Sequence, residues 1–193
     1  MNSTLKLKLM MRIKYLWHFI LYLIFRFEKW HLSSIESRDY SVDLVNFINR
    51  DISNEARVVE IGCGLGEIIS CINCQHRYGY DVSKNVINAA RKRSIFNKVI
   101  FNIGSFNSFS NLEIDYLIAV NFLHDFDKKQ LNEWFHQVTN NNNINKIIVD
   151  EVSDAGYAYN HHFESLLKNS YPKITVINCG YKYGRSLKAF SKT

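Results

Sequence analysis

The sequence predicts one α/β domain with a doubly wound, mostly parallel sheet and helices on both of its faces. After residue 55, short β-branched runs alternate with helical stretches, and a glycine cluster follows the first run. The chain has 193 residues, 47% of them hydrophobic, which is enough for one full-sized domain and too little for two. We therefore expect a helical extension over residues 1–54 and the α/β domain over residues 55–193.

Seven runs rich in β-branched and aromatic residues are expected to form the sheet. They are Arg57–Ile61, Arg77–Asp81, Lys98–Asn102, Ile114–Val120, Lys146–Asp150, Lys173–Asn178 and Ser186–Phe190. Only the turn Gly180–Gly184 separates the last two runs. Because no helix fits between them, they predict an antiparallel hairpin at one edge of the sheet.

Helical patterns fill most of the intervals between these runs. A short helix is expected from the glycine cluster to about Cys74, and further helices over Ser83–Lys92, Asp127–Val138 and Tyr159–Lys168, with Ser83 as an N-cap. The polar run Asn140–Asn143 has turn-forming side chains and no periodicity, which predicts a loop.

The positive charge of the chain is concentrated at its N-terminus. Residues 1–30 contain six basic side chains and one acid, so they carry most of the net charge of +6. The remaining chain is nearly neutral, which does not fit a large nucleic-acid footprint. We therefore expect no nucleic-acid partner.

Residues 15–25 form an apolar run interrupted only by His18. Eleven residues are too few to span a bilayer, which takes about 20, and no small-residue cleavage site follows. One interpretation is a helix that packs on the domain or on a second subunit. The other is a helix in the membrane interface, with basic residues near anionic lipid. Residues 8–30 are thus a predicted site of peripheral membrane contact or self-association.

The four cysteines predict reduced thiols in a cytoplasmic protein. Cys71 and Cys74 are followed by His76, with Cys63 nearby, which allows a zinc cluster as an alternative. The spacing lacks a second clean pair and falls inside a predicted helix and strand. We therefore favour structural thiols and expect no metal.

The stretch Val58–Gly66 (VVEIGCGLG) places an acid and three alternate glycines at the end of the first predicted strand. Glycine lets the backbone turn tightly and lets a ligand approach it closely. Asp81 ends the next strand, where a carboxylate can accept hydrogen bonds from both hydroxyls of a ribose. The strand, the glycines after it and the acid at the end of the next strand together indicate a nucleoside-containing cofactor. A purely structural turn, and for Asp81 a helix cap, are the alternatives.

This E-x-G-x-G-x-G stretch resembles the first motif of the class I S-adenosylmethionine-dependent methyltransferases, and Gly79–Ser83 is similar to their second motif. The resemblance covers about residues 55–193 and implies a Rossmann-like, seven-stranded sheet that binds S-adenosylmethionine. It also implies a set of cofactor-binding residues. They are Glu60, Gly62, Cys63, Gly64 and Gly66 at the methionine portion, Asp81 and Val82 at the ribose, Ser105 and Phe106 at the adenine, and Asn121 and Phe122 facing the methyl donor.

The family often has an acid at the adenine, where this chain has Ser105. The fourth strand ends Asn121–Asp125, similar to the family's N-x-L-H turn. His124 is the best candidate general base and Asp125 a weaker one, and the alternative interpretation of His124 is a packing residue. His161 and His162 are weaker still.

The acceptor is expected to be a small molecule, such as a sugar, a cell-envelope precursor or a lipid-linked group. The N-P-P-[YF] turn of amino-methyltransferases and the Pro-Cys nucleophile of cytosine-C5 enzymes are both absent, since the only proline is Pro172. Trp30, Arg38 and Tyr40 lie in a segment that is either a lid over the site or a helical cap on the sheet. With Tyr157, they are the predicted acceptor-binding residues.

Two other functions remain open from the sequence. One is a non-catalytic, cofactor-binding scaffold on the same fold, and the other is a nucleotide-dependent oxidoreductase. The intact glycine loop favours an enzyme over a scaffold, and its spacing differs from the G-x-G-x-x-G of nicotinamide dehydrogenases.

Overall fold

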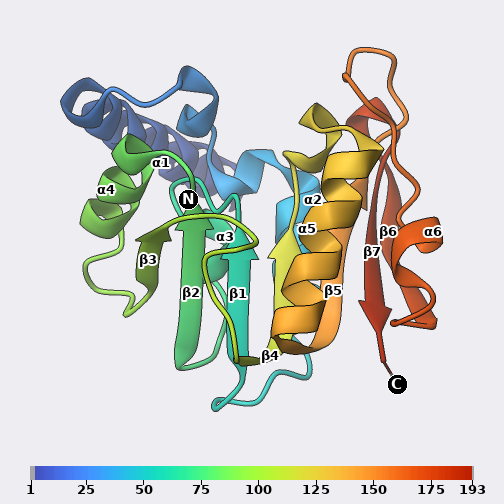
Figure 1. The fold of residues 1–193 in the computed structure, drawn as a ribbon. Helices are drawn as coiled ribbons and strands as arrows, with labels where there is room; N and C mark the ends of the chain where they lie inside the picture. The colour runs from blue at the N-terminus through green and yellow to red at the C-terminus, as the bar shows by residue number, and fades with distance from the viewer. Residues whose placement is uncertain (1–2, 193) are drawn as a thin grey trace.

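The computed structural model describes residues 3–192, with side chains from residue 8 onward. Its centre is one seven-stranded sheet in the order β3-β2-β1-β4-β5-β7-β6 (Figure 1). The strands are β1 (Arg57–Ile61), β2 (His76–Asp81), β3 (Ile100–Ile103), β4 (Glu113–Ala119), β5 (Asn143–Glu151), β6 (Lys173–Tyr181) and β7 (Arg185–Ser191). Strands β1 to β5 are parallel, and β7 runs antiparallel to both β5 and β6. The predicted fold class is confirmed.

Helices cover both faces of the sheet (Figure 1). On one face, α2 (Asp39–Asn49), α3 (Glu67–Ser70) and α4 (Lys84–Arg93) contribute Leu44, Ile69 and Ile87 to one apolar core. On the other, α5 (Lys128–Asn141) and α6 (Glu164–Leu167) contribute Phe135 and Leu167 to a second core. The central strands are almost wholly buried, because a parallel sheet is covered on both sides.

The N-terminal segment forms the long helix α1 (Ser3–Phe25) and the short helices η1 (Lys29–Leu32) and η2 (Ile35–Ser37). One side of α1 packs against α4, where Leu21 joins Val86 and Ala89 in a small third core. Residues 26–38 then cross to α2 at the carboxyl ends of the parallel strands (Figure 1). None of the described helices has the length and apolar content needed to cross a membrane.

Several predicted boundaries are wrong. The helix after the glycines ends at Ser70, short of Cys74, and the helix expected over Tyr159–Lys168 spans only Glu164–Leu167. The expected loop Asn140–Asn143 shrinks to Asn142, whose side chain donates a hydrogen bond to the Val138 carbonyl at 3.0 Å. This side-chain bond satisfies a carbonyl group in the last turn of α5, and β5 begins directly after Asn142.

The predicted N-cap of α4 is confirmed. The Ser83 hydroxyl accepts a hydrogen bond from the Val86 amide at 3.4 Å. This satisfies one of the amide groups that the first turn of a helix leaves without a partner.

Candidate active site

A cavity of about 510 Å³ lies at the carboxyl ends of β1, β2 and β4. Its walls come from the loops after these strands and after β3, from the segment between α1 and α2, and from Trp134 of the helix that follows β4. The chain order reverses here, because β1 lies between β2 and β4, and such switch points are where open α/β sheets bind ligands. The volume is in the usual range for small-molecule and cofactor sites.

The loop after β1 forms the floor of this cavity, and it requires glycine. Gly62 and Gly64 have φ angles of +66° and +55°. A Cβ on Gly62 would lie 2.6 Å from the Phe122 ring, and one on Gly64 would lie 2.9 Å from His31 Nδ1. The two glycines thus make room for side chains of the opposite walls, and both line the cavity.

Asp81, at the end of β2, is tied to the glycine loop. Its Oδ2 accepts a hydrogen bond from the Gly64 amide at 3.1 Å, and its Oδ1 accepts one from the Ser83 amide at 2.9 Å. Burial raises the pKa of the Asp81 carboxyl, while these two amides act in the opposite direction. Each oxygen keeps a second lone pair for a hydroxyl group in the cavity.

Glu60, the acid of the glycine motif, lies in β1 beneath the cavity. Its Oε2 accepts a hydrogen bond from the Ile69 amide at 3.0 Å. Burial raises the pKa of Glu60 from 4.5 to about 8. The side chain is therefore mostly protonated at neutral pH and can donate as well as accept a hydrogen bond.

The raised pKa of Glu60 predicts a specific pH dependence of stability. Between its ordinary value of 4.5 and about 8, the native state holds a proton that the unfolded state releases, so the free energy of unfolding falls as pH rises. In Glu60→Gln this component is absent, and urea unfolding from about pH 5 to about pH 8 should show a smaller decline. The exposed Glu133→Gln is the matched control and should decline like the wild type. Equal slopes in the wild type and Glu60→Gln would contradict the assignment.

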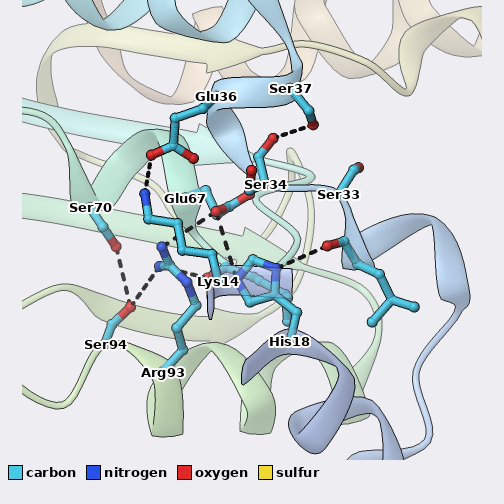
Figure 2. A network of polar contacts seen from close by, with 12 residues as sticks. Lys14, His18, Ser33, Ser34, Glu36, Ser37, Glu67, Ser70, Arg93 and Ser94 are labelled. Atoms are coloured by element: carbon cyan, nitrogen blue, oxygen red, sulfur yellow. Dashed lines mark hydrogen bonds and ion pairs between the residues drawn. The ribbon is translucent and has the colours of Figure 1, made fainter. Parts of the chain in front are cut away.

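Glu67, the first residue of α3, is a buried charge centre that links three segments (Figure 2). Its carboxylate lies 2.7 Å from Arg38 Nη2, 3.6 Å from Arg93 Nη2 and 3.7 Å from His18 Nε2. Close by, Lys14 of α1 forms an ion pair with Glu36. These contacts fix α1 and the following segment to the helix that begins directly after the glycine loop.

A second buried pair supports the turn after β4. Asn121 has a positive φ of 69°, and its amide donates a hydrogen bond to Asp150 Oδ1 at 2.8 Å. The other oxygen of Asp150 pairs with Arg185, which also donates to the Tyr157 hydroxyl at 3.2 Å and lies over the Tyr40 ring. Asp150 and Arg185 are both buried, so each neutralises the other.

Removing Arg185 should be strongly destabilising. Arg185→Met would leave the Asp150 carboxylate buried without a countercharge, which costs about 3–5 kcal/mol in comparable sites. Chemical unfolding should show this loss, and Arg185→Met/Asp150→Asn should recover a large part of it, because the amide needs no countercharge. A loss below about 1 kcal/mol in the single variant would contradict the account.

The structure brings most of the predicted site residues to one cavity. Its walls include the following of them: Trp30, Arg38, Tyr40, Glu60, Gly62, Cys63, Gly64, Asp81, Val82, Ser105, Asn121, Phe122 and Asp125. The segment between α1 and α2 therefore forms a wall of the cavity, and the adjoining α2 packs on the sheet.

Four predicted residues do not line the cavity. Gly66 faces Phe101, whose ring would lie 2.3 Å from an added Cβ. The Phe106 ring is buried against Trp134, and the Tyr157 hydroxyl accepts the hydrogen bond from Arg185. His124 lies directly behind the wall, where its ring packs on Tyr157 at a centroid distance of 4.2 Å.

His124 and Asp125 occupy the short helix η3 (Leu123–Asp125), and only Asp125 reaches the cavity. His124 Nε2 lies 3.8 Å from Asp125 Oδ1. Burial lowers the pKa of His124, against the opposing effect of Asp150 and Asp125. The neutral imidazole is the form that can take up a proton.

Sequence reasoning overlooked His31, Glu67 and Asn107 as members of the cavity wall. Burial and the nearby Arg38 lower the pKa of His31 to about 4, so its imidazole is neutral at physiological pH. Glu67 directly follows the glycine motif in the sequence, and this position could have indicated that it lines the cavity. Nothing in the local sequence marks Asn107, which lies in the loop after β3.

The cysteines do not gather into a cluster. Cys63 and Cys74 are buried, and Cys71 and Cys179 are exposed. Within residues 3–192, no group of three or more histidine, cysteine or acidic side chains is arranged to hold a metal ion.

We compared the chain with known protein families and with curated protein sequences. Residues 59–142, from β1 to the end of α5, match a protein family described as a methyltransferase domain. No curated protein sequence matches the chain.

Solved structures are similar in fold. Magnesium protoporphyrin IX methyltransferase from Synechocystis, solved with bound S-adenosylmethionine, has a TM-score of 0.66 at 14% identity over 80% of this chain and 79% of that one. The N-methyltransferase NodS from Bradyrhizobium japonicum has a TM-score of 0.64 at 15% identity over 80% of this chain and 95% of that one. At these identities the likeness is one of fold.

Proposed function

We propose that this chain, which carries a methyltransferase domain with the class I fold, transfers a methyl group from S-adenosylmethionine to a small-molecule acceptor. The resemblance that the glycine motif indicated is confirmed by the family match and by the fold. The observation that carries the proposal is the junction of the glycine loop and Asp81 at one wall of the cavity.

The residues of the cavity fit S-adenosylmethionine. Asp81 has lone pairs free for the two ribose hydroxyls, and Gly62, Cys63 and Gly64 line the cavity where the methionine portion would lie. Of the four acids in the described wall, Glu60 is mostly protonated and Glu67 pairs with arginine, which leaves the carboxylates of Asp81 and Asp125. These two negative charges suit a ligand with a positive sulfonium centre.

The cofactor supplies a methyl group already activated on a sulfonium, so the reaction is an in-line displacement. The chain then has to align the acceptor and exclude water. Trp30, Phe122, Phe126 and Trp134 give the cavity an aromatic wall that can do both. If the acceptor is a hydroxyl, we propose that Asp125 accepts a hydrogen bond from it and passes its proton on to His124, whose Nε2 lies 3.8 Å from Asp125 Oδ1.

The acceptor that we propose is a small hydroxylated molecule, such as a sugar, a cell-envelope precursor or a lipid-linked group. The size of the cavity supports a small acceptor. Aromatic side chains beside the Asp125 carboxylate and the Arg38 guanidinium also suit a ring that carries hydroxyl groups.

The test is transfer of a labelled methyl group from S-adenosylmethionine to a panel of such acceptors. The wild type should label at least one of them, and His124→Asn and Asp125→Asn should lower kcat by about a hundredfold or more. His124 does not line the cavity, so His124→Asn should leave the affinity for the donor unchanged. Donor binding with no transfer to any small molecule would overturn the acceptor proposal and favour a non-catalytic scaffold.

A further inference from the structure

The outward side of α1 is an apolar surface that no described part of the chain covers. We call it the outward face; its exposed members are Leu9, Met10, Ile13, Leu16, Trp17, Phe19, Ile20, Leu23 and Ile24. They are between 37% and 64% exposed, and their spacing places them on one side of the helix. Soluble monomers seldom expose so large a continuous apolar surface unless it binds a partner.

The opposite side of α1 is fixed to the domain. Leu21 is fully buried in the third core, and His18, only 1% exposed, lies 3.2 Å from the Leu32 carbonyl oxygen and 3.7 Å from Glu67. Lys14 pairs with Glu36 on the same side (Figure 2). These contacts hold the helix to the domain between Lys14 and Leu21, and the outward face lies on its other side.

The charges around the outward face are predominantly positive. Helix α1 contains no acidic residue. Lys8 and Arg12 are exposed next to this face, and Arg26 and Lys29 are exposed just beyond the C-terminal end of the helix. The only acid in residues 1–30 is Glu28. A partner of this face must therefore combine an apolar layer with negative charge.

We propose that the outward face of α1 binds the surface of an anionic lipid bilayer, with the helix parallel to the membrane plane. Aliphatic and tryptophan side chains would enter the boundary of the acyl chains, and the exposed basic residues would lie among anionic headgroups. A second copy of this chain fits less well, because it would bring two sets of like charges together. The proposal is independent of methyl transfer, since it uses no residue of the cavity.

The test is flotation of the full chain with vesicles of pure phosphatidylcholine or with vesicles that also contain phosphatidylglycerol. The wild type should float with the anionic vesicles at least about tenfold better than with the neutral ones, and raised salt should weaken this preference. Leu16→Ser/Ile20→Ser should bind at least about tenfold more weakly. Lys8→Gln/Arg12→Gln should lose the preference for anionic lipid by a similar factor.

The matched control removes two exposed apolar side chains far from α1. Ile100→Ser/Val176→Ser alters the two edge strands, at residues that are 52% and 54% exposed, and should float like the wild type. Thermal unfolding confirms that each variant is folded. Wild-type protein that stays unbound with both kinds of vesicle overturns the proposal. So does a stable dimer in sedimentation that Leu16→Ser/Ile20→Ser dissociates, because the outward face would then bind a second copy.

Discussion

Asp81→Asn is expected to weaken binding of S-adenosylmethionine and S-adenosylhomocysteine by at least about a hundredfold. The change replaces the carboxylate that would accept hydrogen bonds from both ribose hydroxyls. Hydrogen bonds to charged groups contribute about 1.5–3 kcal/mol each. It also weakens the bond from the Gly64 amide, at 3.1 Å, that joins β2 to the glycine loop. Calorimetric titration of the wild type and the variant measures the difference.

Asp115→Asn is the matched control for this change. Asp115 likewise accepts a backbone hydrogen bond, from the Arg57 amide at 2.8 Å, but it does so at the opposite end of β1. Its replacement should lower stability slightly and leave the affinity for the cofactor unchanged. Wild-type affinity in Asp81→Asn, or equal losses in both variants, would show that Asp81 does not hold the cofactor.

Gly62→Ala is expected to weaken binding of the cofactor strongly in a chain that still folds. The new Cβ would lie 2.6 Å from the Phe122 ring, so the ring and the loop would have to move at the floor of the cavity. The φ of +66° adds backbone strain of about 1–2 kcal/mol. We expect a loss of affinity of at least about thirtyfold, together with a lower free energy of unfolding.

Gly180→Ala separates the effect of the clash with Phe122 from the effect of backbone strain. Gly180 has a similar positive φ of +84°, but nothing lies within 4 Å of its added Cβ. This variant should therefore show the backbone strain alone, with normal binding of the cofactor. If Gly62→Ala binds as well as Gly180→Ala does, the glycine loop is not the floor of the cofactor site.

Local sequence patterns were sufficient to predict the sheet. Buried parallel strands such as Arg57–Ile61 are short β-branched runs, and that signal does not depend on distant contacts. Helix lengths were less predictable, because they depend on such contacts. The chain from Tyr159 to Phe163 stays irregular, since the Phe163 amide donates to Glu151 at 2.9 Å and the Tyr159 amide donates to the His124 carbonyl at 3.0 Å.

The glycine loop and Asp81 could also be predicted, because the motif and the end of the next strand are both visible in the sequence. The sequence alone does not explain why His18 interrupts the apolar run. In the fold, the His18 side chain lies beside Glu67. The Asp150–Arg185 pair joins β5 to β7 and could not be predicted either. Such contacts depend on which strands become neighbours, and no local pattern records that choice.

Calorimetric titration of the wild-type chain with S-adenosylhomocysteine, with a nicotinamide dinucleotide as the comparison ligand, tests the central claim most directly. We predict one site of micromolar affinity for S-adenosylhomocysteine and no heat of binding for the dinucleotide. Binding of the dinucleotide alone, or of neither ligand by protein that unfolds cooperatively, would contradict the assignment of the cavity to S-adenosylmethionine.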